Sequence, residues 1–527
     1  DANNIGNIVE SNNIINVNGG IDSSTVQTLS KNISGTGTIN IQGYVNNIAN
    51  IKQDTLNILA TGVVDTVLAN LDIVNDIDNA GKLIVSAGDA AQLSNNIVNT
   101  TGELTIKNGN IITADKHITQ KNLTINTGAG LEADVNDLSI ITIINDGTIK
   151  LSANTENTDL QNDIVDTDSD ADQGTLIITA GNITNNNDMV IKQHNLSIMS
   201  DAGLTTTFDK LVVGANSINN NGQLVLSGNA TGSDAFNYIM NGNGTITFKG
   251  ENTEVEAKKV IYNNIVNEGK LTVDAQNIGG SVLNSNTLNL GAGTLSQAII
   301  GGVDEEGNAI NTVGTLNITD SVVNNAYIAQ KELSIASAAS LTSDLNGLEI
   351  NDDINNAGTL TLSADGASIN NNINGNSGNL VIEEGSLIDV ATGKSIAQNT
   401  LTNKGDFTAN ADQLEITNAI TNTGDFTLIG GTLEEAIAGT GGTTWIEGDV
   451  IAENSIGQEI NVVSGSLTID ADKVGGEVNS AANVVLTGDS KTLAQAVTGH
   501  GDNSLTEIAG NIIANAKISD NIKVSGT

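Results

Sequence analysis

The chain has 527 residues and is strongly acidic, with 61 Asp and Glu against 20 Lys and Arg and a formal net charge of −41. All 20 Lys and Arg residues are lysines, and they form no stripe. Nucleic acid and anionic lipid are therefore poor partners, because both require clustered cations, and we expect no nucleic acid partner. Without cysteine the chain has neither disulfides nor thiol chemistry, and no apolar run is long enough for a membrane helix. We therefore expect membrane attachment only through regions outside this segment.

The composition also argues against an ordinary globular core. Aromatic residues make up only 2% of the chain, so stacked Ile, Leu and Val in a narrow interior are the remaining way to bury apolar surface. Proline is absent. That absence suits a fold in which nearly every backbone N–H bonds to a neighbouring coil, since proline would interrupt such a ladder almost anywhere.

The first recurring pattern, in chain order, lies close to the N-terminus. Residues 29–41 read Leu-x-x-x-Ile-x-Gly-x-Gly-Thr-Ile-x-Ile, and looser copies return at 239–250, 433–448 and 493–510. A phosphate-binding loop is disfavoured, because no Lys-Ser/Thr and no helical pattern follow the glycines. We interpret this pattern as a tight corner between two coils.

The second pattern predicts a strand, a bend and a second strand. Residues 71–85, 348–362 and 414–428 place apolar residues at even spacings on both sides of Asn-x-Gly. Such a unit cannot bury its apolar face alone, so it must stack on copies of itself. The residues expected to point inward include Leu348, Ile350, Leu360, Leu362, Leu414 and Leu428.

These patterns recur along the whole chain without a helical segment between them. We therefore predict one continuous, all-β solenoid over residues 1–527. At about 4.8 Å per strand spacing, it would form about 25 coils and a rod on the order of 120 Å long. Asparagine is abundant, and we expect identical amides on successive coils to hydrogen-bond up the axis as a ladder.

Residues 154–173 form an acidic segment that we predict to be a strand-free loop insertion. Asp166, Asp168 and Asp170 match the first three ligand positions of a calcium-binding loop, but Ala171 and Ile177 stand where glycine and a bidentate Glu are required. A weak, extracellular-type Ca²⁺ site and a solvated acidic loop both stay open, and the solvated loop is favoured. No other cofactor is expected.

Alternating Leu-Thr-Leu strands, broken by Asn-x-Gly and interleaved with Ile-x-Gly-x-Gly-Thr-Ile, resemble the passenger regions of type V secreted proteins. These are the autotransporter and filamentous-haemagglutinin-like surface proteins of Gram-negative bacteria, and the texture is similar to that of rickettsial surface cell antigens. The resemblance covers essentially the whole chain. It implies a right-handed parallel β-helix, export across the outer membrane, and an extracellular position at the bacterial cell surface.

The resemblance also implies a non-enzymatic role as an adhesin, whose receptor or glycan on a host cell or other surface is not identified by the sequence. One alternative is a surface-coat protein, similar to a surface layer, or a filament that forms by self-association. The sequence hardly distinguishes a surface coat or filament from an adhesin, because all of them have the same composition and fold.

A carbohydrate-active β-helix enzyme is the second alternative. Its active site would need converging carboxylates or a basic residue beside bound calcium, yet there is no arginine and the carboxylates are scattered singly. His117, His194 and His500 are far apart and share no motif, so a Ser/His/Asp site has no local support. We therefore expect no enzymatic activity.

Overall fold

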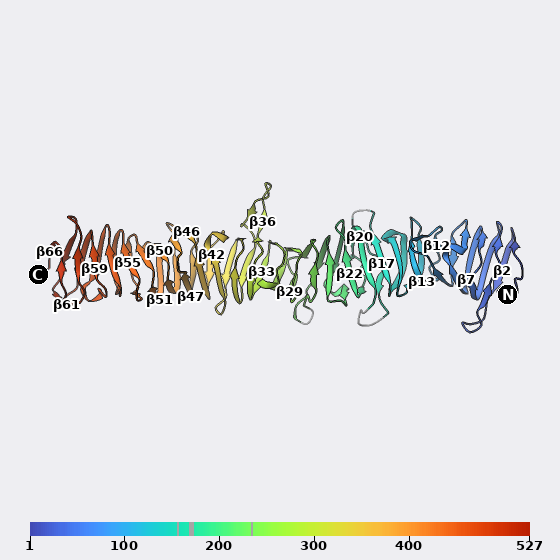
Figure 1. Cartoon of the computed structure of the whole chain (residues 1–527), viewed down its shortest axis with the longest axis horizontal. Helices are drawn as coiled ribbons and strands as arrows, with labels where there is room; N and C mark the ends of the chain where they lie inside the picture. The colour runs from blue at the N-terminus through green and yellow to red at the C-terminus, as the bar shows by residue number, and fades with distance from the viewer. Residues whose placement is uncertain (155–156, 168–172, 233–234, 527) are drawn as a thin grey trace. The chain divides into compact units, whose positions relative to one another are not determined.

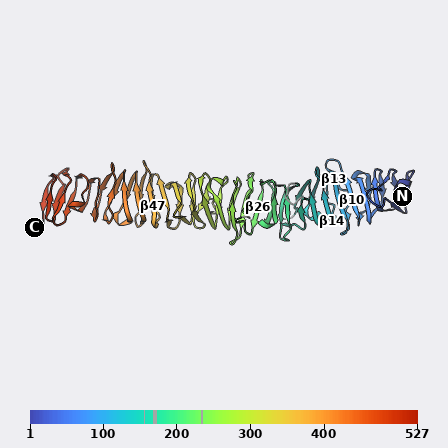
Figure 2. The same cartoon turned by 90° about the horizontal axis from the view of Figure 1, so that it is seen from below.

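A computed structural model describes residues 1–154, 157–167, 173–232 and 235–526, and its strands form a parallel β-solenoid of about 25 turns with almost no helix (Figure 1). The fold class and the number of coils predicted from the sequence are thereby confirmed. The chain divides into two compact units, residues 1–266 and 267–527. Within each unit the strands of successive coils lie side by side in both views (Figures 1 and 2).

Unit 1 illustrates how the coils stack. Parallel pairing joins β10 (Lys82–Ser86), β13 (Glu103–Ile112), β14 (Ile118–Ile125) and β16 (Leu138–Asn145) in register. One inward column through these strands consists of Leu83, Leu104, Leu123 and Ile143, all fully buried. Successive side chains of a strand point to opposite faces, so the residues immediately before and after each of these four positions face outward.

Unit 2 has the same construction. One nine-stranded parallel sheet consists of β46 (Asp365–Ile369), β48 (Leu387–Val390), β50 (Asp406–Ala409), β52 (Asp425–Leu428), β55 (Thr443–Ile446), β57 (Glu459–Val462), β59 (Val478–Ser480), β62 (Val497–Gly499) and β65 (Ile518–Ser519). Another wall contains β38 (Thr315–Ile318), β41 (Glu332–Ile335), β44 (Ile354–Asn356), β47 (Ile373–Ile382), β49 (Ile396–Asn403) and β51 (Leu414–Asn422). A further set of paired strands consists of β39 (Ser321–Asn324), β42 (Ser340–Asp344) and β45 (Thr359–Ser363).

The predicted inward residues are buried with one exception. The confirmed positions are Ile350, Leu360, Leu362, Leu414 and Leu428. Leu348 is only partly buried. It is the first residue of β43 (Leu348–Ile350), directly after the 3₁₀ turn η7 (Leu345–Gly347). It pairs with the fully buried Ile328 and is followed by the exposed Glu349, so the strand alternation already holds at this position.

The glycine-rich pattern forms corners, as predicted. Gly35 has φ +132° and Gly439 has φ +137°, values that side-chain-bearing residues rarely adopt. A Cβ atom at Gly439 would also clash with the carbonyl of Asn422 on the preceding coil. The backbones of adjacent coils therefore approach each other too closely at these corners for any other residue.

The Asn-x-Gly bends contain buried asparagines that link consecutive coils. The Asn356 side chain accepts a hydrogen bond from the Gly358 N–H at 3.2 Å and donates to the Asn379 carbonyl of the next coil at 3.0 Å. The same pair of bonds occurs at Asn220, Asn267, Asn403 and Asn422. Each side-chain amide thus provides a partner for a turn N–H and for a backbone carbonyl of the next coil, at a bend where the backbone ladder is interrupted.

The expected amide ladder is present, but it has a second form that the sequence did not suggest. Asn403 donates directly to Asn422 on the next coil at 2.8 Å. Asn356 also donates to Gln398 at 2.6 Å, although Gln398 lies two coils further along. We call this second arrangement the amide clamp. Its other pairs are Asn79 with Gln120, Asn145 with Gln193, and Asn284 with Gln330.

The amide clamp requires glycine on the intervening coil. A Cβ atom at Gly378 would lie 2.7 Å from Gln398 Oε1, and Gly102, Gly174 and Gly314 are blocked in the same way by their own clamps. The intervening coil can also carry a segment that projects from the solenoid. Between Asn284 and Gln330 it forms the antiparallel hairpin β36 (Gly302–Val303) and β37 (Ala309–Ile310), which projects from unit 2 in Figure 1.

The acidic segment at 154–173 differs from the strand-free loop that the sequence suggested. Within residues 154–173, β18 (Thr158–Asp159) and β19 (Asp163–Val165) pair with neighbouring coils, and Ile164 is fully buried. This segment is therefore not strand-free, because its alternating apolar residues still fit the inward columns.

Leu360→Asp tests the interior column. Leu360 is fully buried, so an unpaired carboxylate there should destabilise the fold by about 4 kcal/mol or more. Urea unfolding followed by circular dichroism measures this change. Val463→Asp is the control, because Val463 is 44% exposed and should tolerate the charge. Equal unfolding midpoints for Leu360→Asp and the parent would contradict the inward register.

Gln398→Leu tests the amide clamp. This change leaves one N–H of the buried Asn356 side chain without an acceptor, so we expect a loss of about 2 kcal/mol in unfolding free energy. Gln42→Leu is the control, because it removes an amide bond to Asn18 at an exposed position. If both variants unfold at the urea concentration of the parent, the clamp contributes no stability.

Candidate functional site

The structure describes only one of the three predicted calcium ligands. Asp166 directly follows β19, and its side chain is fully buried with Oδ1 at 3.3 Å from Lys192 Nζ. Asp168 and Asp170 lie outside the described residues. The described part of the chain holds no group of three or more His, Cys, Asp or Glu residues that could bind a metal ion. The Ca²⁺ site stays a prediction, and Asp166 already has a cationic partner.

The histidines do not build a catalytic triad. His117 Nδ1 lies 3.7 Å from Asp137 Oδ1, while Thr113 donates to the other oxygen of Asp137 at 2.8 Å. In a Ser/His/Asp site the hydroxyl must bond to the histidine, whereas here it bonds to the carboxylate. His194 lies on a later coil of unit 1, and His500 lies in unit 2.

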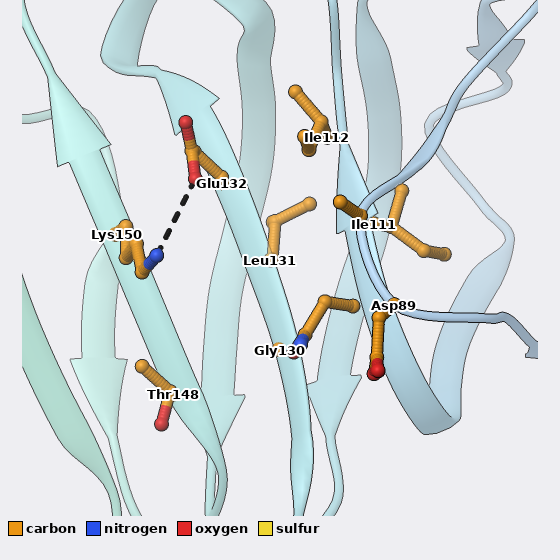
Figure 3. Close-up of a pocket in the computed structure, with 10 residues that line it drawn as sticks. Asp89, Ile111, Ile112, Gly130, Leu131, Glu132, Thr148 and Lys150 are labelled. Atoms are coloured by element: carbon orange, nitrogen blue, oxygen red, sulfur yellow. Dashed lines mark ion pairs between the residues drawn. The ribbon is translucent and has the colours of Figure 1, made fainter.

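A hollow of about 300 Å³ lies on the outer face of unit 1, beside the loop that carries Asp89. Its wall comes from β13, β15 (Ala129–Asp134) and β17 (Thr148–Ser152), and Figure 3 shows Asp89 on the loop in front of these strands. Lys150, the one cation that lines it, pairs with Glu132 at 3.5 Å. The hollow thus presents hydroxyl, amide and carboxylate groups without an activated nucleophile.

A second hollow, of about 400 Å³, lies at a corner of unit 2 and brings two carboxylates together. Asp406 and Asp425 are register partners on β50 and β52. Burial raises the pKa of Asp406, and the negative charge of Asp425 raises it further. Trp445, the only tryptophan, donates from its indole N–H to Asp425 at 3.1 Å. A carboxylate with an elevated pKa, as at Asp406, can exchange a proton with a ligand.

The sequence analysis did not find this carboxylate pair. It treated the carboxylates as single residues on separate turns, although the tripeptide Asp-Phe-Thr occurs at both 406–408 and 425–427. The identical tripeptides were the available signal, because Phe407 and Phe426 stack inside unit 2 with ring centroids 5.5 Å apart. That contact aligns the two preceding aspartates on the outer face.

A comparison with protein-family models, curated proteins and solved structures finds no match for this chain. Among the described residues, no helix has the length and apolar character needed to cross a membrane. The resemblance to type V passenger regions is therefore supported at the level of the parallel β-solenoid, and the function must be argued from the surfaces of this chain.

Asp406→Asn tests whether burial and the charge of Asp425 destabilise the ionised Asp406. A raised pKa means that the ionised Asp406 destabilises the folded state, and this cost grows as the pH rises through the folded-state pKa. The variant should therefore melt above the parent at pH 7. The difference should shrink towards pH 3, where the parent residue is protonated. Thermal melts at both pH values measure the effect, and a difference that does not change with pH would show that the ionised Asp406 does not destabilise the fold.

Proposed function

We propose that this chain is a non-enzymatic binding protein of the bacterial cell surface, the passenger-like part of a type V secreted adhesin. The supporting observation is that the outer faces carry hydrogen-bonded columns of neutral polar side chains. In unit 1, Asn57 donates to Asn40 and Asn40 donates to Asn16, at 2.8 and 2.9 Å. In unit 2, Asn317 donates to Asn289 at 2.9 Å.

Such columns suit recognition of an extended partner. Each coil contacts only its neighbours, so the apolar interior and the buried amides maintain the fold while the outer residues are free to vary. Amide and hydroxyl groups on rigid strands are fixed donors and acceptors, which lowers the entropy lost on binding. Projecting segments such as the β36–β37 hairpin add further contact surface without disturbing the coils.

The absence of cysteine also fits export. A chain that crosses the outer membrane unfolded cannot carry premature cross-links, and stacking of one coil on the next lets folding propagate outside the cell. The net charge of −41 favours solubility at the cell exterior and disfavours nucleic acid as a partner. The partner we propose is a receptor or glycan on a host cell or other surface.

One observation favours the carbohydrate-active alternative. Asp406 and Asp425 lie side by side on consecutive coils, and glycoside hydrolysis uses a pair of carboxylates. However, Asp425 already accepts the indole N–H of Trp445. Both aspartates also face outward, and Asp406 is only partly desolvated, so water reaches the pair. We therefore favour binding over catalysis.

The adhesin is tested by presenting the purified chain on beads to epithelial cells and by labelling intact source cells with an antibody against it. We expect saturable adhesion, surface labelling, and the same adhesion for the Asp406→Asn/Asp425→Asn double variant. Oligosaccharides incubated with the protein should stay intact. Cleavage that the double variant abolishes would instead establish the enzyme, and a regular lattice on the cell surface without adhesion would establish the coat.

A further inference from the structure

We propose that a corner groove of unit 2 binds an N-acetylhexosamine unit of a neutral glycan. This inference rests on the proposed adhesin function and names the ligand class. The groove has a volume of about 630 Å³, within the range usual for small-ligand sites. It is lined by residues of 323–327 on one coil, 342–347 on the next, and Ser363.

The groove contains an aromatic ring held in a fixed orientation. Tyr327 precedes β40 (Ile328–Gln330), and its hydroxyl donates to Glu349 on β43. This bond, followed by burial and the charge of Glu349, raises the pKa of Tyr327 to about 12. The phenol therefore stays neutral with its hydroxyl engaged, and the apolar ring remains available to pack against the C–H face of a sugar.

A glycine on the next coil leaves space beside this ring. Gly347 precedes Leu348, which pairs with Ile328, so Gly347 occupies the position next to Tyr327. A Cβ atom at Gly347 would meet only the Ala326 carbonyl, at 3.2 Å. A larger side chain would require this carbonyl to shift by a few tenths of an ångström and would fill the space beside the ring.

The loop that carries Tyr327 is rigid. The buried Asn324 side chain donates to the Ala326 carbonyl and to Ser343 on the next coil, both at 2.9 Å, and accepts the Ala326 N–H at 3.0 Å. These bonds fix the loop before any ligand arrives. A site on a preorganised loop loses little conformational entropy on binding.

A corner in unit 1 repeats this loop without the groove residues. Asn47 donates to the Ala49 carbonyl and to Thr66 on the next coil, both at 3.0 Å, as Asn324 does in unit 2. By alignment on these bonds, Asn50 takes the place of Tyr327, and Asn70, the last residue of η2 (Leu68–Asn70), takes the place of Gly347. The corner therefore folds without the tyrosine and the glycine, so stability does not require either one.

The chemistry of the lining selects the sugar. Val323 is 45% exposed and, with Ala326, offers an apolar contact for an acetyl methyl group. The exposed Asn325 supplies an amide that can pair with the acetamido group, and hydroxyls come from Thr342 and Ser363. Asp344 at the groove and Glu349 at the Tyr327 hydroxyl repel anionic sugars, as does the net charge of −41.

The test uses the tetramer of N-acetylglucosamine and the whole chain, with binding followed by saturation-transfer NMR. We expect saturation of the acetyl methyl and ring protons, and a dissociation constant that Tyr327→Ala and Gly347→Leu each raise about tenfold. Tyr327→Phe keeps the ring and should weaken binding less. Gly457→Leu is the matched control, because a Cβ there also lies near one carbonyl, at 3.3 Å, in the same unit.

Three results would overturn the proposal that the groove binds this sugar: no binding of the tetramer, weakening by Gly457→Leu as large as that by Gly347→Leu, or binding of cellotetraose, which lacks the acetamido groups, as tight as that of the tetramer.

The experiments distinguish a failure of this proposal from a failure of the adhesin proposal. If Tyr327→Ala beads adhere to cells as well as the parent and the tetramer does not bind, the groove is wrong and the adhesin stands. If the tetramer binds at the groove but the parent beads do not adhere, the groove stands and the adhesin is wrong.

Discussion

The structure depends on buried asparagine amides that complete the hydrogen bonding between coils. A parallel solenoid satisfies its strand backbone by stacking, but every bend interrupts the ladder and buries polar groups. At the Asn-x-Gly bends one asparagine side chain accepts the N–H of its own turn and donates to a backbone carbonyl of the next coil, as Asn356 does with Gly358 and Asn379. An apolar residue at this position would leave both groups unsatisfied.

The amide clamp extends this principle to coils of unequal length. In each clamp the asparagine keeps its bond to a backbone carbonyl of the adjacent coil, while its second N–H reaches a glutamine two coils away instead of an asparagine side chain on the adjacent coil. Asn284 and Gln330 enclose the coil that carries the β36–β37 hairpin in this way. A solenoid with such clamps tolerates projecting segments, since the interior stays closed around them.

Because the interior is satisfied by amides and aliphatic columns, the chemistry of binding is left to the outer faces and corners. The three hollows differ accordingly. The hollow beside Asp89 contains a neutralised ion pair, the hollow at Asp406 contains repelling carboxylates, and the groove at Tyr327 contains an immobilised ring beside an open space. Of these three, the groove places an aromatic ring beside neutral hydroxyl and amide groups, a combination that suits a sugar.

Local sequence by itself determined the strand period, the Asn-x-Gly bends and the glycine corners, because each depends on residues a few positions apart. It placed Leu348 fully in the interior, where the structure leaves it partly buried, and it missed the amide clamp, the Asp406–Asp425 pair and the groove of Tyr327 and Gly347. Those features depend on register between coils. Successive partners are 17 residues apart at Asn267 and Asn284 but 28 apart at Asn289 and Asn317, so only the tertiary structure decided which side chains meet.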